Sequence, residues 1–229
     1  MQEIDRDEVR RLIAEEGAQV VEVLPAKEYE EEHLPGAVSL PLKELGNDAV
    51  GALDRSRPVI VYCYDYQCDM SPRAAWRLDS LGFARVYDYV AGKADWMAAG
   101  LPTEGASAGT RRITDIARGD VPRCELGETV SQVRERMAGW DVCVVVNERD
   151  VVLGIVRAEA LALEDDRPVS AVMQEGPSTF RPNLGLVELA GHLRKRGLPR
   201  VLVTRSDGTL IGLVRLEDIP DEQAANDGS

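Results

Sequence analysis

Two cysteines, Cys63 and Cys68, are the side chains of this 229-residue chain whose type and spacing best suit covalent chemistry. Cys63 directly follows the apolar run Val59–Tyr62, and Ser71 and Pro72 downstream provide a good N-cap and first residue for a helix. A cysteine at a strand's carboxyl end, facing a loop that feeds a helix N-terminus, lies among unpaired N–H groups and the positive end of a helix dipole. We therefore expect a site that stabilises a thiolate or a persulfide anion.

The elements that must position these thiols alternate along the first half of the chain. Strands that alternate with amphipathic helices are typical of a parallel sheet. The predicted elements are a helix at Arg6–Glu16, strands at Gln19–Val23, Pro58–Cys63 and Val86–Tyr89, and helices at Ser71–Leu81 and Lys93–Ala99. The small and polar run from Gly105 to Thr110 then predicts a linker with high backbone freedom.

The second half of the chain repeats itself. Residues 143–157 align without a gap with residues 201–215, and both runs read as strand, turn and strand. Each copy follows a stretch with apolar residues at helical spacing, Thr129–Met137 in the first copy and Leu186–Arg196 in the second. A unit of this size cannot easily bury its helix faces and its sheet alone, so we expect the copies to pack against each other.

Composition argues against several classes of function. The formal net charge is -13, and no basic block with interleaved aromatic residues matches the surface of a nucleic-acid binder. No stretch approaches the roughly 18 apolar residues of a membrane-spanning helix, and residues 1–17 read as an acidic amphipathic helix rather than a secretion signal. With four cysteines, two of them close together, we expect a cytoplasmic protein with reduced thiols.

The first half resembles the rhodanese family. The resemblance is carried by residues 28–41, 59–63, 74–75, 81–87 and 92–102. In the family's first signature, a Gly-His-Ile-Pro-Gly-Ala stretch, Glu32 replaces the first glycine and Leu34 the isoleucine. The resemblance implies a parallel α/β sheet flanked by helices, and a strand-end cysteine, here Cys63, that takes a sulfane sulfur and passes it to a nucleophilic acceptor. It implies no cofactor for this step, and small molecules or proteins as sulfur donor and acceptor.

The sequence departs from the family pattern around the cysteine. Rhodaneses usually carry a short loop with a glycine and basic residues, whereas residues 64–70 form a longer loop that contains Asp65 and Asp69. These carboxylates should raise the pKa of a thiol and repel thiosulfate. The usual Asp-x-Arg after the first strand is changed to residues 22–24, Glu-Val-Leu. We therefore expect weak turnover of thiosulfate and favour a protein or low-molecular-weight persulfide donor.

The two cysteines compete for the role of nucleophile. The spacing from Cys68 to Arg73 resembles the family's interval from cysteine to arginine, which makes Cys68 an alternative nucleophile. The strand-end position favours Cys63, with Cys68 as a resolving thiol that closes a disulfide or takes over a persulfide. Arg73 then supports the anion or the loop. Two packed thiols on a domain that only binds are the competing interpretation.

Other residues with reactive side chains have plainer interpretations. We expect His33 to hydrogen-bond across a turn and His192 to be solvated on the surface of a helix. Cys124 and Cys143 lie in strand-like settings that favour packing. No pair of cysteines or histidines has zinc-ligand spacing followed by a second such pair, so we predict no metal.

The second half resembles a tandem pair of CBS domains, known as a Bateman module. The family signature, Gly-apolar-Val-Thr/Ser-x-x-Asp, is matched by Gly154–Ala160 and Gly212–Asp218. In the family the aspartate holds a ribose and the hydroxyl approaches a phosphate, which implies an adenosyl nucleotide (AMP, ADP, ATP or S-adenosylmethionine). Here both hydroxyl positions are arginine, Arg157 and Arg215, and only Asp218 keeps the carboxylate, so we expect at most one ribose site. Arginine can still bind a phosphate, and a pair that binds nothing is the alternative.

These observations predict an α/β rhodanese-like sheet followed by an α+β tandem CBS pair. We place the first domain at residues 1–104, the linker at 105–110 and the pair at 111–222, with copies at about 111–167 and 168–222, and a flexible tail at 223–229. CBS pairs commonly dimerise, which predicts a homodimer through the pair.

The sequence favours two functions. The first is a sulfurtransferase or persulfide carrier whose activity is set by an adenosyl nucleotide at the CBS pair. The alternative is a non-catalytic sensor or scaffold in which Cys63 and Cys68 report redox state. Phosphatase chemistry is a third class, but the aspartates at 65 and 69 argue against a phosphate guest.

Overall fold

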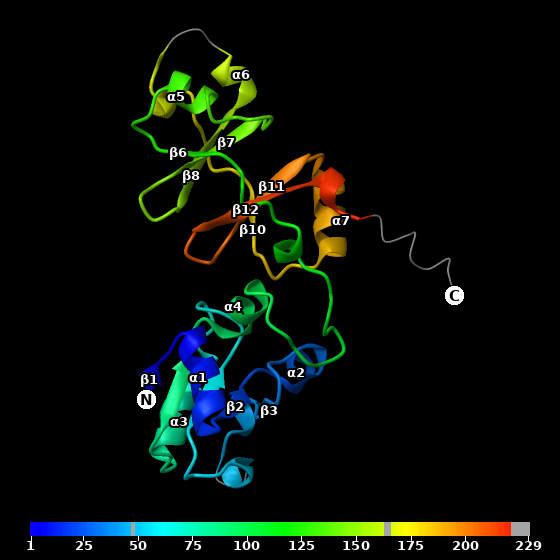
Figure 1. Ribbon diagram of the computed structural model, residues 1–229. Helices are drawn as coiled ribbons and strands as arrows, with labels where there is room; N and C mark the ends of the chain where they lie inside the picture. The colour runs from blue at the N-terminus through cyan, green and yellow to red at the C-terminus, as the bar shows by residue number, and fades with distance from the viewer. Residues whose placement is uncertain (47–48, 163–165, 221–229) are drawn as a thin grey trace, which may run out of the picture. The chain divides into compact units, whose positions relative to one another are not determined.

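The structure is a computed structural model that describes residues 1–46, 49–162 and 166–220. The tail predicted at residues 223–229 lies outside the described residues. The chain divides into two compact units, one from Met1 to Thr110 and one from Arg111 onward (Figure 1).

A five-stranded, all-parallel sheet forms the centre of the first unit, in the order β1-β5-β4-β2-β3. The strands are β1 Gln2–Glu3, β2 Gln19–Glu22, β3 Val38–Ser39, β4 Val59–Tyr62 and β5 Val86–Tyr89. The central strand β4 is buried along its whole length, as a parallel strand covered on both faces requires. The α/β fold predicted for this half is therefore confirmed.

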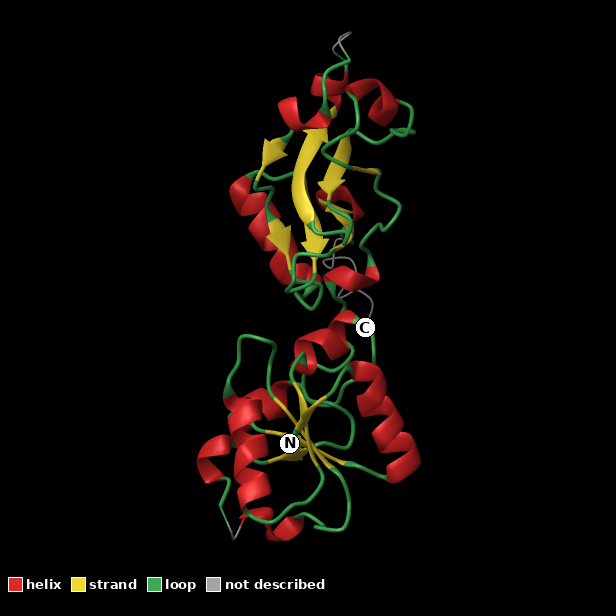
Figure 2. Cartoon of the chain, turned by 90° about the vertical axis from the view of Figure 1, so that its left-hand side faces the viewer, coloured by secondary structure: helices red, strands yellow, loops and turns green. Residues whose placement is uncertain are grey.

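Helices cover both faces of this sheet (Figure 2). They are α1 Arg6–Glu16, α2 Ala26–Glu31, α3 Met70–Ser80 and α4 Gly92–Ala98, with 3₁₀ turns at Leu42–Glu44 and Ala49–Ala52. Ala74 and Leu78 of α3 share one core with Cys63. Leu12 of α1 shares the other core with Tyr62. Because successive side chains of a strand point to opposite faces, Cys63 faces α3 whereas Tyr62 faces α1.

The segment predicted as a linker is hydrogen-bonded to α2. The amides of Ala106 and Ser107 donate to the carbonyl oxygens of Glu30 and Glu31 at 3.0 and 2.9 Å. Gly105 (φ +114°) approaches these carbonyls so closely that a Cβ would lie 2.7 Å from the oxygen of Glu31. The carbonyls of a helix's last turn have no partner within the helix, and this segment supplies one. These hydrogen bonds hold residues 105–107 against the end of α2.

Two copies of one supersecondary unit form the second half of the chain. The first consists of β6 Arg123–Cys124, α5 Val130–Arg134, β7 Val142–Val146, β8 Val152–Arg157 and α6 Ala158–Leu161, and β9 Gln174–Glu175 extends its sheet to the order β6-β7-β8-β9. The second consists of β10 Thr179–Phe180, α7 Leu186–Arg196, β11 Arg200–Thr204 and β12 Leu210–Arg215, with the 3₁₀ turn Leu216–Asp218. Further 3₁₀ turns lie at Ile113–Asp115 and Val169–Ala171.

The two copies share a hydrophobic core, as the repeat predicts. Its buried members are Val121, Val142, Val144, Val146, Leu202, Leu210 and Leu213. The hairpin turns also meet, because the amide of Val152 donates to the carbonyl of Gly208 at 3.1 Å and that of Leu210 donates to Asp150 at 2.9 Å. Each copy therefore buries through its partner the surface that it cannot bury alone.

Candidate functional site

Cys63 lies immediately after β4 and is completely buried. Its Sγ lies 3.3 Å from the carbonyl oxygen of Cys68, 3.3 Å from Oγ of Ser71 and 4.0 Å from the carbonyl oxygen of Asp65. Two of these three neighbours are acceptors only, so the sulfur is placed to donate its proton. The surroundings expected from the sequence, a ring of amides around a negative sulfur, are therefore largely replaced by carbonyl oxygens.

Burial raises the pKa of the Cys63 thiol to about 12, and the Cys68 thiol beside it adds to the rise. The hydroxyl and the backbone N–H of Ser71 lower this pKa, but by less. Dehydration of the buried sulfur thus outweighs the donors at the start of α3 and favours the neutral thiol. The choice of Cys63 or Cys68 as nucleophile stays a prediction.

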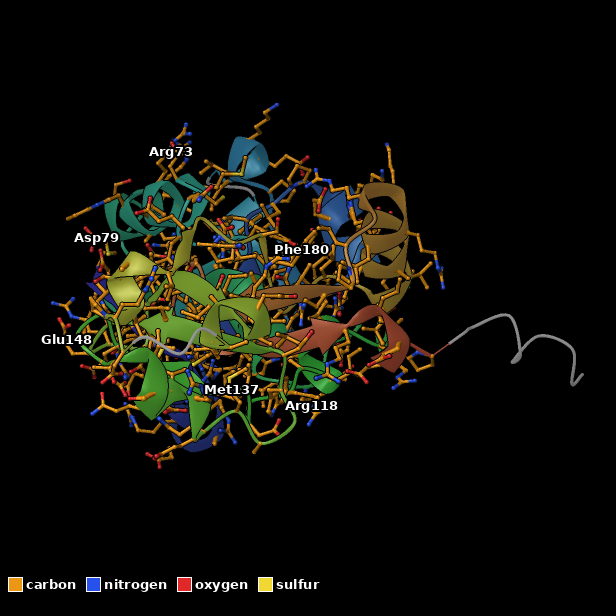
Figure 3. The ribbon with its side chains drawn as sticks, turned by 90° about the horizontal axis from the view of Figure 1, so that it is seen from above. Arg73, Asp79, Arg118, Met137, Glu148 and Phe180 are labelled. Carbon is orange, nitrogen blue, oxygen red and sulfur yellow. The ribbon has the colours of Figure 1, made fainter. Side chains whose placement is uncertain are left out.

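Cys68 is the more accessible of the two thiols. It is half-buried, packs against the same core as Cys63, and its amide donates to the carbonyl of Asp65 at 3.1 Å. Arg73 points outward from α3 (Figure 3), where its side chain is 63% exposed and pairs with Asp69 at 3.4 Å. The structure thus brings the two cysteines together, whereas Arg73 is engaged at the surface.

The first turn of α4 fixes the beginning of the cysteine loop. The amides of Lys93 and Ala94 donate to the carbonyl oxygens of Cys63 and Tyr64 at 3.1 and 2.9 Å. Gly92 makes this approach feasible, because it adopts φ +61° and a Cβ there would lie 2.6 Å from the carbonyl oxygen of Cys63. The free N–H groups of a helix start therefore bind the loop's backbone.

A buried ion pair anchors α4 on the opposite face of the sheet. Nζ of Lys93 lies 2.9 Å from Oε1 of Glu22, the last residue of β2, and donates to the carbonyls of Glu32 at 2.7 Å and Glu28 at 3.0 Å. The hydroxyl of Tyr62 lies close by, and burial together with the charge of Glu22 raises the pKa of Tyr62. Sequence analysis missed Lys93, for which the signal was a lysine at the start of a short helix that follows a buried strand.

Asp88 on β5 is a second buried acid, on the same face as Cys63. It pairs across the sheet with Val61, whose side chain shares the face of Cys63. Neither carboxyl oxygen has a hydrogen-bond partner. Burial raises the pKa of Asp88, while the hydroxyl of Ser71 lowers it. Sequence analysis missed this residue, although an acid within the apolar run Val86–Tyr89 was a signal.

Two surface cavities open beside α3. One, of about 330 Å³, is lined by Val23, Pro25, Ala26, Pro41, Leu42, Lys43, Glu44, Met70 and Arg73. The other, of about 370 Å³, shares Leu42, Lys43 and Arg73 and adds Leu45 and Arg77. Neither cysteine lines these two cavities.

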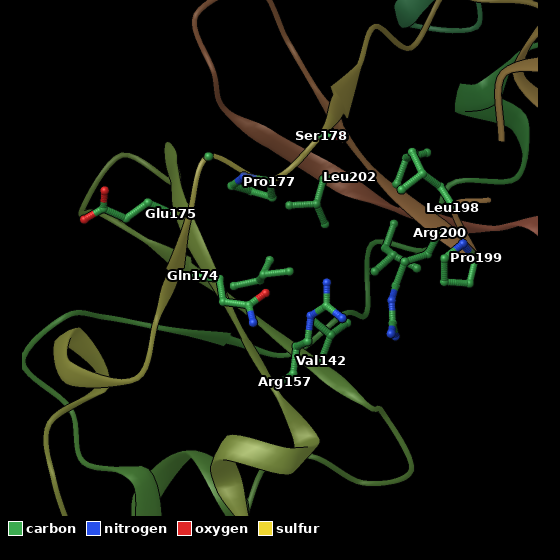
Figure 4. Close-up of a pocket in the computed structure, with 14 residues that line it drawn as sticks. Val142, Arg157, Gln174, Glu175, Pro177, Ser178, Leu198, Pro199, Arg200 and Leu202 are labelled. Carbon is green, nitrogen blue, oxygen red and sulfur yellow. The ribbon is translucent and has the colours of Figure 1, made fainter. Parts of the chain in front are cut away.

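The second unit contains a cavity of about 280 Å³ between its two copies. Figure 4 shows the guanidinium of Arg157 and the amide of Gln174 near each other inside it, with Arg200 on another wall. The lining of this cavity therefore contains cationic and amide hydrogen-bond donors, together with apolar side chains that include Val142 and Leu202. Of the three ligand residues predicted for the CBS pair, it takes in Arg157.

Arg215 and Asp218 do not line this cavity. The guanidinium of Arg215 lies 5.0 Å from the ring centre of Trp140, and that of Arg118 lies 4.4 Å from the same ring. Trp140 occupies the position in the first copy that Leu198 occupies in the second, and Leu198 lines the open cavity. The equivalent place beside Arg215 thus holds an indole with two guanidinium groups, and Oδ2 of Asp218 is buried there without a hydrogen-bond partner.

The remaining candidates have structural settings. Nδ1 of His33 lies 2.6 Å from the carbonyl oxygen of Tyr29, on whose ring the imidazole stacks. His192 is half-buried on α7, with Nε2 3.5 Å from Oε1 of Glu188 and its ring centre 5.7 Å from that of Phe180. Cys124 and Cys143 are buried in the core of the first copy.

Two negative findings concern the described residues alone. In residues 1–46, 49–162 and 166–220, no group of three or more histidine, cysteine, aspartate or glutamate side chains gathers as a metal site. Over the same ranges, every helix is too short or too polar to cross a bilayer.

Comparisons with known proteins place both halves of the chain. The family model described as a rhodanese-like domain matches residues 5–99, and that of the CBS domain matches residues 169–223. The solved CBS domains of a transcriptional regulator from Streptococcus pneumoniae share 20% identity and a TM-score of 0.42, over 48% of this chain and 96% of that one.

Two curated relatives match the first half. The HTH-type transcriptional regulator Rv0324 of Mycobacterium tuberculosis is 36% identical over 91 residues, which are 39% of this chain and 39% of that protein. The chain thus spans less than half the length of this relative. The thiosulfate sulfurtransferase GlpE of Coxiella burnetii is 31% identical over 96 residues, which are 42% of this chain and 87% of GlpE. The chain therefore belongs to the rhodanese-like family, with CBS domains in its second half.

Proposed function

We propose that the chain is a sulfurtransferase or persulfide carrier in which Cys63 and Cys68 form one dithiol site. The observation that supports this most is that both thiols meet at the carboxyl end of β4, in the cysteine loop of a rhodanese-like domain. GlpE is named a thiosulfate sulfurtransferase, and the match to this chain covers 87% of GlpE. Cys63 is the persulfide nucleophile of this proposal.

The two cysteines have different tasks in this proposal. Cys68 is half-buried and is the thiol that a donor meets first, whereas Cys63 is enclosed and protects a bound sulfane sulfur from water. Asp69 and Arg73 neutralise each other at the loop's edge, so little positive charge is left for the thiosulfate dianion. A neutral or singly charged persulfide is therefore the favoured donor class.

Mass spectrometry after exposure to glutathione persulfide tests this assignment. Wild type is expected to gain one sulfur atom on Cys63, Cys63→Ser to gain no stable sulfur in the loop, and Cys68→Ser to keep the sulfur on Cys63 for longer because the resolving thiol is absent. Loss in the Cys68→Ser variant alone would reverse the roles. A wild-type protein that gains no sulfur on either residue would exclude sulfur transfer.

A redox sensor is the second candidate function, and the burial of Cys63 is the observation that favours it. A thiol whose pKa is raised to about 12 is a poor nucleophile at neutral pH, and Cys68, whose thiol interacts with it, is the partner with which it would form a disulfide on oxidation. The same mass spectrometry separates the two functions, because a sensor would show only the disulfide between Cys63 and Cys68.

The cavity around Arg157 is our proposed site for an anionic adenosyl nucleotide. Its volume of about 280 Å³ approaches the lower end of ligand pockets, and Arg157 can pair with a phosphate in the bidentate manner of arginine. Asp218, the residue that the resemblance assigns to a ribose, does not line this cavity. The ligand is therefore held through its anionic groups more than through its ribose.

Thermal-shift titrations with AMP, ADP, ATP and S-adenosylmethionine test this site. We expect the phosphorylated ligands to raise the melting temperature of wild type and Arg149→Ala, an exposed control, but not of Arg157→Ala. Arg215→Ala distinguishes the two places, because it should keep the shift if the open cavity is the site. A wild-type melting temperature that no ligand moves would remove the nucleotide from the proposal.

A homodimer through the CBS pair and a cytoplasmic location complete the proposal. Light scattering of the purified chain is expected to give twice the monomer mass, and a monomer at micromolar concentration would contradict the dimer.

A further inference from the structure

The two cavities beside α3 form one groove at the carboxyl edge of the sheet. The first is lined by residues that follow β2 and β3, among them Val23 and Leu42, and by Met70 at the start of α3, which follows β4. In an open α/β sheet, ligands bind in the crevice outside this edge. The second cavity shares Leu42, Lys43 and Arg73 with the first, and we call the two together the α3 groove.

The α3 groove lies next to the cysteine loop. Met70 lines the groove and stands two residues after Cys68, a stretch of chain that spans at most about 7 Å. Leu42, Met70 and Cys68 also pack against the hydrophobic cluster that contains Cys63. The groove and the two thiols therefore share one edge and one face of the sheet.

Positive charge collects in the groove although the chain as a whole is acidic. Lys43, Arg73 and Arg77 line it together with one acid, Glu44, whereas the net charge of the chain is -13. Lys43 is exposed, and within the described residues no ion pair or hydrogen bond is found for its side chain. Cations gathered along a concave surface attract an anion.

The two arginines of the groove keep donors for a ligand. Arg73 pairs with the exposed carboxylate of Asp69 at 3.4 Å and points outward from α3 (Figure 3). Arg77 donates through Nε to the carbonyl oxygen of Leu45. A guanidinium has five N–H donors in a planar fork, so each arginine can hold its protein partner and still bind a carboxylate.

The rest of the lining is apolar, and the volume suits a small molecule. Six of the nine residues around the first cavity are apolar, and its volume of about 330 Å³ lies at the lower end of ligand pockets. A peptide of two or three residues combines carboxylates with an apolar body. An extended tripeptide spans about 10 Å, which is more than the stretch of chain from Met70 to Cys68.

The acids of the cysteine loop restrict where such a ligand carries its charge. Asp65 and Asp69 lie in the loop and repel a donor whose negative charge is on or next to its sulfur atoms, as in thiosulfate. In a peptide thiol, several bonds separate the carboxylates from the sulfur. Its sulfur can therefore approach the acidic loop while its carboxylates face Lys43 and Arg77.

We propose that the α3 groove binds the carboxylates of a low-molecular-weight peptide thiol, which carries the sulfane sulfur to the cysteine loop. This inference rests on the proposed function and deepens it, because it names the class of sulfur donor. Lys43 and Arg77 hold the donor and take no part in the bond changes at sulfur. The groove therefore acts on the affinity for the donor and leaves the chemical step unchanged.

Isothermal titration calorimetry with S-methylglutathione tests the groove in the full-length protein. This probe has both carboxylates of glutathione but no thiol, so its binding does not depend on sulfur transfer. Wild type, Lys43→Gln and Lys43→Arg are compared with Lys195→Gln, which changes an exposed lysine in the last turn of α7. The diethyl ester of the probe, which lacks both negative charges, is the matched control ligand.

Lys43→Gln is expected to weaken binding of the probe by about 3- to 5-fold, the upper end for one exposed ion pair. Lys43→Arg and Lys195→Gln should keep the wild-type affinity. The diethyl ester should bind wild type more weakly than the probe does, and equally to wild type and Lys43→Gln, because the interaction that Lys43 makes is then absent from both. In sulfur uptake from glutathione persulfide, Lys43→Gln should raise KM by the same factor and leave kcat unchanged.

Three results would overturn the groove as the donor site. A wild type that does not bind the probe would do so, and sulfur uptake by the same protein would leave the proposed function intact. Equal affinities of Lys43→Gln and Lys195→Gln for the probe would place the binding elsewhere. Equal affinities of wild type for the probe and its diethyl ester would show that the carboxylates are not recognised.

Failure of the proposed function gives a different pattern. Probe binding that depends on Lys43, in a protein that takes up no sulfur from glutathione persulfide, would support the groove as a carboxylate site and reject sulfur transfer.

Discussion

The sulfur of Cys63 shows how two opposing effects are resolved at a single residue. The start of α3 supplies donors that favour a negative sulfur, namely the hydroxyl and amide of Ser71. Enclosure removes the water that would solvate the thiolate, and the carbonyl oxygens of Asp65 and Cys68 turn their negative ends toward it. Dehydration and the carbonyl oxygens raise the pKa of Cys63 by more than Ser71 lowers it, so Cys63 is a neutral thiol at neutral pH.

The stability of the protein should therefore depend on pH through Cys63. The folded protein keeps this proton up to a pKa of about 12, whereas an unfolded thiol loses it near its ordinary value of 9.0. Between these values the native state binds more protons, so the contribution to the free energy of unfolding is complete below pH 9 and falls as the pH rises toward 12. Urea unfolding of wild type and Cys63→Ala at a series of pH values measures the difference.

The two unfolding curves are expected to differ by a constant amount below pH 9 and to approach each other above it. Both proteins carry Cys68→Ala, because Cys68 interacts with Cys63. Buried tyrosines and the cysteines of the second unit titrate in both proteins and therefore cancel. A difference that stays constant up to pH 11 would mean that water reaches Cys63 in the folded state.

At the scale of elements, the cysteine loop depends on how closely α4 approaches it. The helix contributes two backbone N–H groups to the carbonyls of Cys63 and Tyr64, and Lys93 ties its first turn to Glu22 on the other face of the sheet. Removing one partner of such a buried pair costs about 3–5 kcal/mol, so this anchor resists displacement. The loop is thus fixed at its first residues.

Replacing Gly92 by alanine should destabilise the protein by more than the positive φ of this residue would cost by itself, because the added methyl group also clashes with the cysteine loop. The position has φ +61°, and the added Cβ would meet the carbonyl oxygen of Cys63 at 2.6 Å and backbone atoms of Tyr64 at 2.7 Å. Gly100 has a similar φ of +66° but nothing within 4 Å. Gly100→Ala therefore measures the free-energy cost of the backbone conformation alone, about 1–2 kcal/mol. Gly92→Ala measures the same cost together with the cost of the steric clash.

Denaturant unfolding gives both values, and alkylation of Cys63 reports on the loop. We expect Gly92→Ala to lose at least about 1 kcal/mol more than Gly100→Ala, in the range of other overpacked sites, and to react faster with iodoacetamide as the loop is pushed away. Equal losses in the two variants would show that α4 can withdraw without effect on the loop.

At the scale of the whole molecule, the buried clusters do not mix the two units. Within the described residues, the two clusters of the first unit contain no residue beyond 101, and the three clusters of the second contain none before 113. A unit with its own core can fold by itself.

Residues 1–110 expressed alone are therefore expected to fold and to keep the chemistry of Cys63. The fragment should unfold cooperatively and take up sulfur from glutathione persulfide at the rate of the full-length protein without nucleotide. Circular dichroism and the mass-spectrometric assay measure the two properties. A fragment that fails to unfold cooperatively would show that the first unit needs the second for its stability.

Several elements could be predicted from the sequence because their signals lie within a few residues. α1 has its predicted bounds, since the Asp5 side chain accepts the amide of Glu8 at 2.9 Å and Gly17 ends the helix at φ +61°. α7 likewise ends at Gly197 with φ +61°. α5 is shorter than the predicted Thr129–Met137, because the chain turns away before Gly139 (φ +88°).

By itself the sequence determined the longer helices α1, α3 and α7, the strands β2, β4 and β5, the internal repeat and the position of Cys63 at the end of a strand, because caps and periodicity act locally. Only the tertiary structure decided that this sulfur is enclosed, that the hydroxyl of Ser71 lies beside it, and that Arg157 rather than Asp218 borders the open cavity. These facts depend on segments far apart in the chain. Burial, and the pKa that follows from it, arises only when those segments pack together.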